Sequence, residues 1–83
     1  MQTSIGMNEL RPGERGIVIA LDAVGALRRR LLDIGLTGRT RVECLGSNTG
    51  GNLTAFRIRG AVIAIRTEDS RLVRVRREGS LWD

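Results

Sequence analysis

The chain has 83 residues, and its basic residues are all arginine: 14 arginines stand against nine acidic residues, for a formal net charge of +5. Without lysine it has neither a phosphate-binding loop of the GxxxxGK[ST] type nor a Schiff-base nucleophile, and without histidine it has no nucleophile–histidine pair. Its one cysteine, Cys44, forms no internal disulfide and no zinc site of the usual kind. We expect a single small domain that is not an enzyme and holds no metal or cofactor.

The first part of the chain predicts a loose terminus, a turn and a strand. Residues 1–6 carry little pattern and are expected to be loosely ordered. Pro12-Gly13 predicts a tight turn, because proline fixes φ and glycine accepts a positive φ. Residues 16–21 follow as a strand that is apolar on both faces. Asp22 is expected to cap the next helix or to lie in the turn before it.

The segment 24–34 predicts a short amphipathic helix. At roughly 100° per residue, the arginines and Asp33 lie outside an arc shared by four apolar residues, Val24, Leu27, Leu31 and Ile34. Gly35 is expected to end the helix in the left-handed conformation, and Gly38 to turn the chain into the next strand. Leu32 points among the arginines and Leu36 lies beyond the glycine stop, so we expect both to be exposed.

The second half predicts four more strands. Residues 39–45 alternate with Thr40, Val42 and Cys44 on the inner face, which favours a buried thiol over a reactive one. Residues 46–52 are a glycine-rich loop that we interpret as a hairpin connection rather than an anion cradle. The remaining segments are strands 53–59, 61–66 and 73–76, with one helical turn at 67–70 and a frayed end at 78–83.

About five short strands, one helix and one helical turn bury their apolar faces best as a strongly bent sheet. The expected fold is mainly β, a small SH3-like partial barrel with the helix over one open end and the last strand paired with the first. The expected domain spans 7–77, between loosely ordered termini at 1–6 and 78–83. The apolar runs are far shorter than the roughly 20 residues that cross a bilayer, and no export signal is visible, so we expect a cytoplasmic protein without direct membrane insertion.

The segments from Met7 to Arg76 together resemble the FeoA family, small accessory proteins of bacterial ferrous iron uptake. The resemblance rests on the spacing of three motifs: Leu10-x-Pro12-Gly13-Glu14-x-Gly16, then Arg30-Leu31-x-x-Ile34-Gly35-Leu36 with Gly38, and Ile58-Arg59-Gly60 followed by Ile63-Ala64-Ile65-Arg66. It implies an SH3-like barrel that binds and modulates FeoB, the GTP-hydrolysing membrane transporter, from its cytoplasmic side. Thr37 and Ser70 depart from the family pattern, which often has proline and alanine at these positions.

On this resemblance, we expect the helix and the turn after it to contact FeoB. The candidate partner-binding residues are those that place apolar groups beside charge on a face that the core does not need: Arg28, Arg29, Leu32 and Leu36. The alternative is that the chain's own termini or loops cover both leucines. The remaining motif residues are structural or binding: Arg30, Gly35, Gly38, Gly60 and Arg66. We expect the two arginines either to pair with Asp33 or Glu68 or to meet the partner.

Two other functions remain open. Nucleic-acid binding is suggested by arginines on the outer faces of three strands, Arg39, Arg41, Arg57, Arg59, Arg74 and Arg76. Against it, the chain offers only Phe56, which is expected to point inward, and Trp82 in the tail as aromatics on which bases could stack. Self-association is the third hypothesis, because Val62 and Ala64 face outward on one strand and Trp82 could act as a tail anchor.

Overall fold

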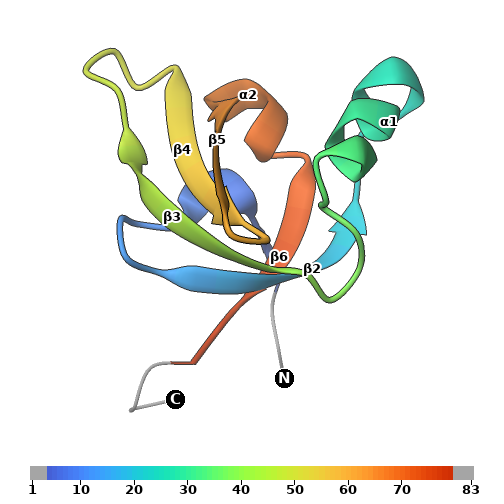
Figure 1. The fold of residues 1–83 in the computed structure, drawn as a ribbon, viewed down its shortest axis with the longest axis horizontal. Helices are drawn as coiled ribbons and strands as arrows, with labels where there is room; N and C mark the ends of the chain where they lie inside the picture. Colours follow the sequence, from blue (N-terminus) through green and yellow to red (C-terminus); the bar gives the residue numbers. More distant parts are fainter. Residues whose placement is uncertain (1–3, 80–83) are drawn as a thin grey trace.

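The computed structural model describes residues 4–79 as one antiparallel sheet with three short helical segments (Figure 1). The strands are β1 (Ser4–Gly6), β2 (Arg15–Leu21), β3 (Arg41–Ser47), β4 (Leu53–Ile58), β5 (Ala61–Arg66) and β6 (Val73–Arg77). The helical segments are the 3-10 turn η1 (Met7–Glu9), α1 (Gly25–Asp33) and α2 (Thr67–Ser70). The strand order β1-β6-β2-β3-β4-β5 confirms a mainly β fold in which the last strand pairs with the first predicted one, β2.

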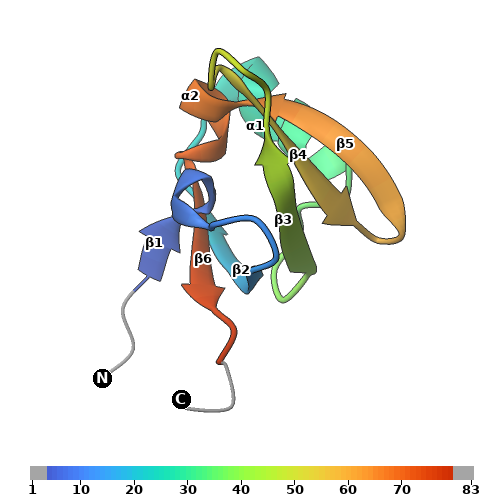
Figure 2. The same ribbon diagram turned by 90° about the vertical axis from the view of Figure 1, so that its left-hand side faces the viewer.

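The sheet bends because two of its strands carry irregular positions. The register of β2 with β6 shifts between Val18 and Ala20, and that of β3 with β4 shifts between Cys44 and Gly46. An extra residue on one strand of a pair increases the local twist and bends the sheet. β2 can therefore pair with β3 through its first residues and with β6 along most of its length. Figure 2 shows the β3–β4–β5 half curving away from the β1–β6–β2 half.

The core lies inside this curve and follows the predicted alternation. Val42, Cys44, Phe56 and Ile58 are buried side chains of β3 and β4, and Val73 and Val75 are those of β6. Burial raises the pKa of the Cys44 thiol above its usual value and Glu14 adds to that shift, while a backbone hydrogen bond at Gly46 works in the opposite direction. The predicted inner face of residues 39–45 and the inward position of Phe56 are confirmed, and the cysteine is a buried side chain.

The prediction for the helix N-terminus was wrong. Val24 was expected to pack in the core, but it is 80% exposed and precedes the helix in an extended conformation. The helix begins at Gly25, whose φ is +63°, so the helical wheel does not extend back to Val24. Asp22 does not cap the helix, because the N-cap position is Val24, which makes no side-chain capping bond; it lies in the connection before the helix, the other position that we expected. Ala23 is the buried residue at this end.

The prediction of an exposed Leu36 was also wrong, since this side chain is fully buried. Gly35 ends the helix as predicted, with a φ of +104°. The Gly35 N–H donates to the carbonyl of Leu32, and the Leu36 N–H donates to the carbonyl of Leu31. This pair of bonds is the Schellman motif, which commonly brings the residue after the glycine against the last turn of the helix. Leu36 therefore joins Leu31 in the core.

Both ends of the described chain are more ordered than we expected. Ser4–Gly6 form β1, a sixth strand that pairs with β6. Arg74 of β6 donates to the Ser4 carbonyl at 2.9 Å. At the other end, Glu78 forms an ion pair with Arg41 at 2.7 Å, so it does not belong to a frayed end. Trp82 lies outside the described residues.

Candidate partner-binding site

The outer side of α1 carries three of the four candidate residues. Arg28, Arg29 and Leu32 line a shallow hollow of about 260 Å³ together with Gly25 and Asp33. Leu32 is 37% exposed, so an apolar side chain does lie among charged groups on this side. The fourth candidate, Leu36, is buried in the core and cannot contact a partner directly. The alternative that the chain itself covers the leucines therefore holds for Leu36 and fails for Leu32.

Val24 is the exposed apolar residue that our reading of the sequence assigned to the core. It stands directly before α1 and is the most exposed of the large hydrophobic residues in the described part of the chain. Gly25 is the sequence feature from which the exposure of Val24 could have been predicted. A glycine at the first helical position allows a positive φ, which separates Val24 from the helical wheel. The outer surface of α1, defined here as Val24, Arg28, Arg29 and Leu32, thus combines two apolar and two basic side chains.

The two arginines of this surface have few partners within the chain. Arg28 reaches only the carbonyl of Leu21, at 3.4 Å, and Arg29 makes no ion pair or side-chain hydrogen bond within residues 4–79. The third arginine of the helix differs, because Arg30 pairs with Asp69 of α2 at 3.3 Å rather than with Asp33 or Glu68. Arg66 makes no ion pair in the same described range. The guanidinium groups of Arg28, Arg29 and Arg66 are therefore available to a partner.

Arg59 holds the segment that follows α1. It lies in the β4–β5 turn with a φ of +51°, and its guanidinium donates to the carbonyl of Gly35 at 3.3 Å and to the hydroxyls of Thr37 and Thr40 at 2.9 and 3.0 Å. Thr37, which stands where the family often has proline, supplies one of these hydroxyls. We infer that Arg59 is a positioning residue for the end of α1, a role that its alternating strand pattern did not reveal.

The connection from α1 to β3 turns at Gly38, as predicted, and at Arg39. The Thr40 N–H donates to the Thr37 carbonyl at 3.1 Å, and Arg39 has the positive φ, of +70°. Gly38 has no positive φ and faces open space. Gly60 does have one, of +85°, in the turn after Arg59. Of the three candidate glycines, the backbone conformation therefore requires Gly35 and Gly60 but not Gly38. Ser70, which replaces a common alanine, is buried and donates to the Thr67 carbonyl.

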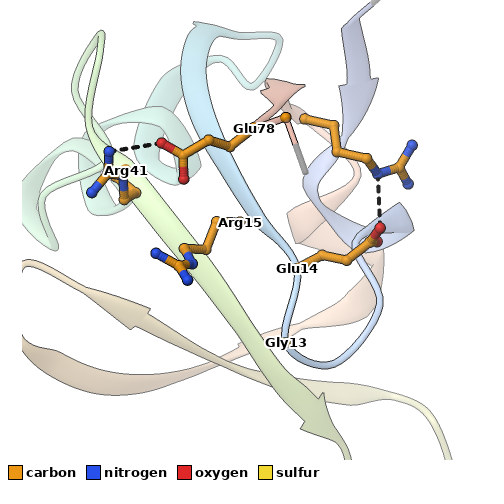
Figure 3. Close-up of a pocket in the computed structure, with 7 residues that line it drawn as sticks. Gly13, Glu14, Arg15, Arg41 and Glu78 are labelled. Atoms are coloured by element: carbon orange, nitrogen blue, oxygen red, sulfur yellow. Dashed lines mark ion pairs between the residues drawn. The ribbon is translucent and has the colours of Figure 1, made fainter. Parts of the chain in front are cut away.

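The outer wall of the sheet is also rich in arginine, but most of these side chains have partners inside the chain. A pocket of about 510 Å³ contains Arg15 and two ion pairs, Arg41 with Glu78 and Arg77 with Glu14 (Figure 3). Arg57 approaches Glu43 to 3.9 Å on the neighbouring strands. The carboxylates in this wall offset much of the positive charge that the alternating arginines indicated in the sequence.

The described residues show no arrangement suited to metal binding or to spanning a membrane. Within 4–79, no group of three or more cysteine and acidic side chains is placed to hold a metal ion. In the same range, no helix has both the length and the apolar character needed to cross a bilayer. On the outer surface of α1, an exposed apolar side chain and basic side chains without ion pairs coincide.

Comparison with solved structures supports the same fold and gives its relatives. A crystal structure of the iron uptake regulatory protein FeoA is 25% identical, with a TM-score of 0.81 over 92% of this chain and 99% of that chain. A FeoA-like protein from Clostridium acetobutylicum is 27% identical, with a TM-score of 0.82 over 90% of this chain and 87% of that one.

FeoA of Stenotrophomonas maltophilia, described as a prokaryotic SH3 domain protein and solved with zinc, is 20% identical over 83% of this chain and 86% of that chain. Its TM-score of 0.74 supports the SH3-like fold. No curated protein sequence matches this chain. The FeoA domain family matches residues 5–77. The chain therefore belongs to the FeoA family, whose members are accessory proteins of ferrous iron transport.

Proposed function

We propose that this protein is a non-enzymatic accessory module that binds FeoB on the cytoplasmic side of the membrane and modulates its transport activity. The observation that carries the proposal is the outer surface of α1, where exposed Leu32 lines a hollow with Arg28 and Arg29 and exposed Val24 directly precedes the helix. Protein interfaces combine apolar contacts with arginine in this way, because the guanidinium pairs with carboxylates while its stem covers apolar area. On this proposal the protein lies at the inner face of the membrane only through its partner.

The rigidity of the surface supports this choice. Leu31 and Leu36 anchor the last turn of α1 in the core, and Arg59 holds the loop that follows. A surface held in this way loses little conformational entropy on binding, which favours affinity. The surface also carries two unpaired positive charges and one acidic neighbour, Asp33, so the complementary area of FeoB should be apolar with acidic residues at its rim.

Nucleic-acid binding is less well supported. At least four of the six arginines that suggested it have partners in the chain: Arg41 on Glu78, Arg57 near Glu43, Arg59 on the loop after α1 and Arg74 on Ser4. Phe56 is fully buried and cannot stack on a base. Salt-sensitive binding to single- or double-stranded nucleic acid, measured at two salt concentrations, would favour this alternative over the FeoB proposal.

The test is binding of the full chain to detergent-solubilised FeoB from the same organism. The double variant Val24→Asp, Leu32→Asp should weaken binding by about tenfold or more, because two apolar contacts become desolvated carboxylates. The variant should also fail to change the rate of GTP hydrolysis by FeoB at concentrations at which the unaltered chain does change it. Circular dichroism should show that both proteins are folded, because the two positions are exposed.

A matched control replaces exposed apolar residues outside α1. The double variant Ile19→Asp, Ala20→Asp changes two exposed side chains of β2, with the same change in charge. It should bind FeoB like the unaltered chain. If the α1 variant binds normally, or if both double variants lose binding to the same extent, the outer surface of α1 is not the specific contact.

A further inference from the structure

The strand β5 forms one edge of the sheet, and its outer edge is bare. It pairs only with β4, while the other edge is the short strand β1. Exposed edge strands present unpaired N–H and C=O groups and are usually protected by charge, proline or a covering segment. The β5 sequence Ala61–Arg66 carries one charge, at its last residue, and no proline. Charge and proline therefore give this edge strand little protection against pairing with another chain. The outer surface of α1 does not include this edge.

The register identifies the backbone groups that point away from β4. Ile58 and Ala61 flank the turn of Arg59 and Gly60, in which both φ values are positive, so they form a hydrogen-bonded pair. Bonded pairs recur at every second residue, which agrees with the bond from the Thr67 N–H to the Asn52 carbonyl at 2.9 Å. Val62 and Ala64 thus direct their backbone N–H and C=O outward.

No other element of the described chain satisfies these outward groups. Within residues 4–79, no hydrogen bond from outside the β4–β5 ladder reaches Val62 or Ala64. Val62 is 60% exposed, and Ala64 is also exposed. The edge therefore offers at least two N–H groups and two C=O groups at the spacing of a β-ladder.

A groove runs beside the edge, between β5 and α1. It has a volume of about 280 Å³ and is lined by Leu31 of α1, by Ile34 just after the helix, by Leu53 of β4 and by residues 63–66 of β5, among others. Its lining contains two arginines, Arg30 and Arg66, and no acidic residue. Arg30 is engaged by Asp69, whereas Arg66 makes no ion pair within the described range. The groove is lined mainly by apolar side chains, and Arg66 is a positive charge among them.

We propose that this groove binds an extended segment of a partner protein, which adds to β5 as a further strand. Strand addition gives affinity through main-chain hydrogen bonds and specificity through pockets for alternate side chains. The segment should carry apolar residues at alternate positions, directed between Leu31 and Ile65, and an aspartate or glutamate that pairs with Arg66. A second copy of this chain fits less well, because its β5 brings an arginine and no acid to pair with Arg66.

This site is separate from the outer surface of α1 and does not depend on FeoB being the partner. The test uses the full chain labelled with ¹⁵N and two synthetic peptides of alternating valine and threonine, one ending in two glutamates and the other in two lysines. The glutamate peptide should slow amide exchange at Val62 and Ala64, and should bind about tenfold more tightly than the lysine peptide. Arg66→Gln should remove most of this preference without affecting the fold, because Arg66 is exposed.

Two further measurements test strand addition itself. Val62→Pro removes an outward N–H and no bond of the β4–β5 ladder, so it should weaken peptide binding about fivefold or more, while Val62→Thr should not. Should the proline variant fail to fold, peptides with N-methyl groups on alternate residues replace it: one set should lose binding and the complementary set should keep it. The proposal is wrong if neither peptide protects the two amides at millimolar concentration, or if protection arises without peptide on raising the protein concentration, which would assign the edge to a second copy.

Discussion

The arginines of the sheet wall and those of α1 have similar sequence patterns but different surroundings. Those of the wall bind groups within the chain, as Arg41 binds Glu78, Arg77 binds Glu14 and Arg59 binds the loop after α1. On the outer side of α1, Arg28 has one long bond to a carbonyl, and Arg29 has no partner within residues 4–79. The number of arginines in a segment therefore says little about binding. What distinguishes the helix is that Arg28 and Arg29 lie beside an exposed apolar side chain, Leu32, and form no ion pair within the described residues, although Asp33 is a neighbour.

The largest expected effect is on the free energy of unfolding, and it should distinguish buried Leu36 from exposed Leu32. Leu36→Ala should lower the free energy of unfolding by about 3 kcal/mol, because it opens a cavity in the core, whereas Leu32→Ala should lower it by less than about 1 kcal/mol. A domain of this size has a total stability of roughly 4–12 kcal/mol, so the loss at Leu36 is a large fraction. Urea unfolding of both variants measures the difference. Equal effects would mean that Leu36 is not the core residue and Leu32 not the surface residue.

A smaller effect on stability is expected when Arg59, in the β4–β5 turn, is replaced, and a still smaller one for Arg57 of β4. Arg59→Ala removes hydrogen bonds to Gly35, Thr37 and Thr40 and should cost about 1–2 kcal/mol, since bonds from charged donors exceed neutral ones. Arg57→Ala removes a half-exposed ion pair at 3.9 Å and should cost less than about 0.5 kcal/mol. Denaturant unfolding gives both values, and amide exchange should become faster at the end of α1 only in the Arg59 variant. Similar costs would remove Arg59 from its positioning role.

The smallest expected effect is on the pH dependence of stability, and it comes from the buried thiol of Cys44. Burial raises the pKa of Cys44, so the unfolded chain loses its thiol proton at a lower pH than the folded chain. The stabilising contribution is therefore complete below about pH 8.5 and is lost as the pH rises through the raised pKa. Unfolding measured between neutral and alkaline pH should show a decline that is shallower in Cys44→Ala. An identical pH dependence in the two proteins would contradict the burial of a titrating thiol.

Local patterns predicted the strands and their inner faces, because alternation over five or six residues reports directly on burial in a sheet. The same reasoning failed wherever the chain changes direction. Val24 and Leu36 lie just outside the two ends of α1, where Gly25 and Gly35 take positive φ values and the wheel no longer applies. β1 was missed because three residues give no period, and its pairing with β6 depends on residues far away in the sequence. The partners of Arg30 and Arg59 could not be predicted for the same reason.

The most direct test of the comparison is the amide exchange footprint of the chain with and without FeoB. Exchange of the full chain, measured by mass spectrometry, should slow in peptides that cover residues 24–33 when solubilised FeoB is added. Peptides that cover the wall strand β3 (Arg41–Ser47) should exchange at the same rate in both samples. Protection confined to the wall, with residues 24–33 unchanged, would contradict the assignment of partner binding to the outer surface of α1.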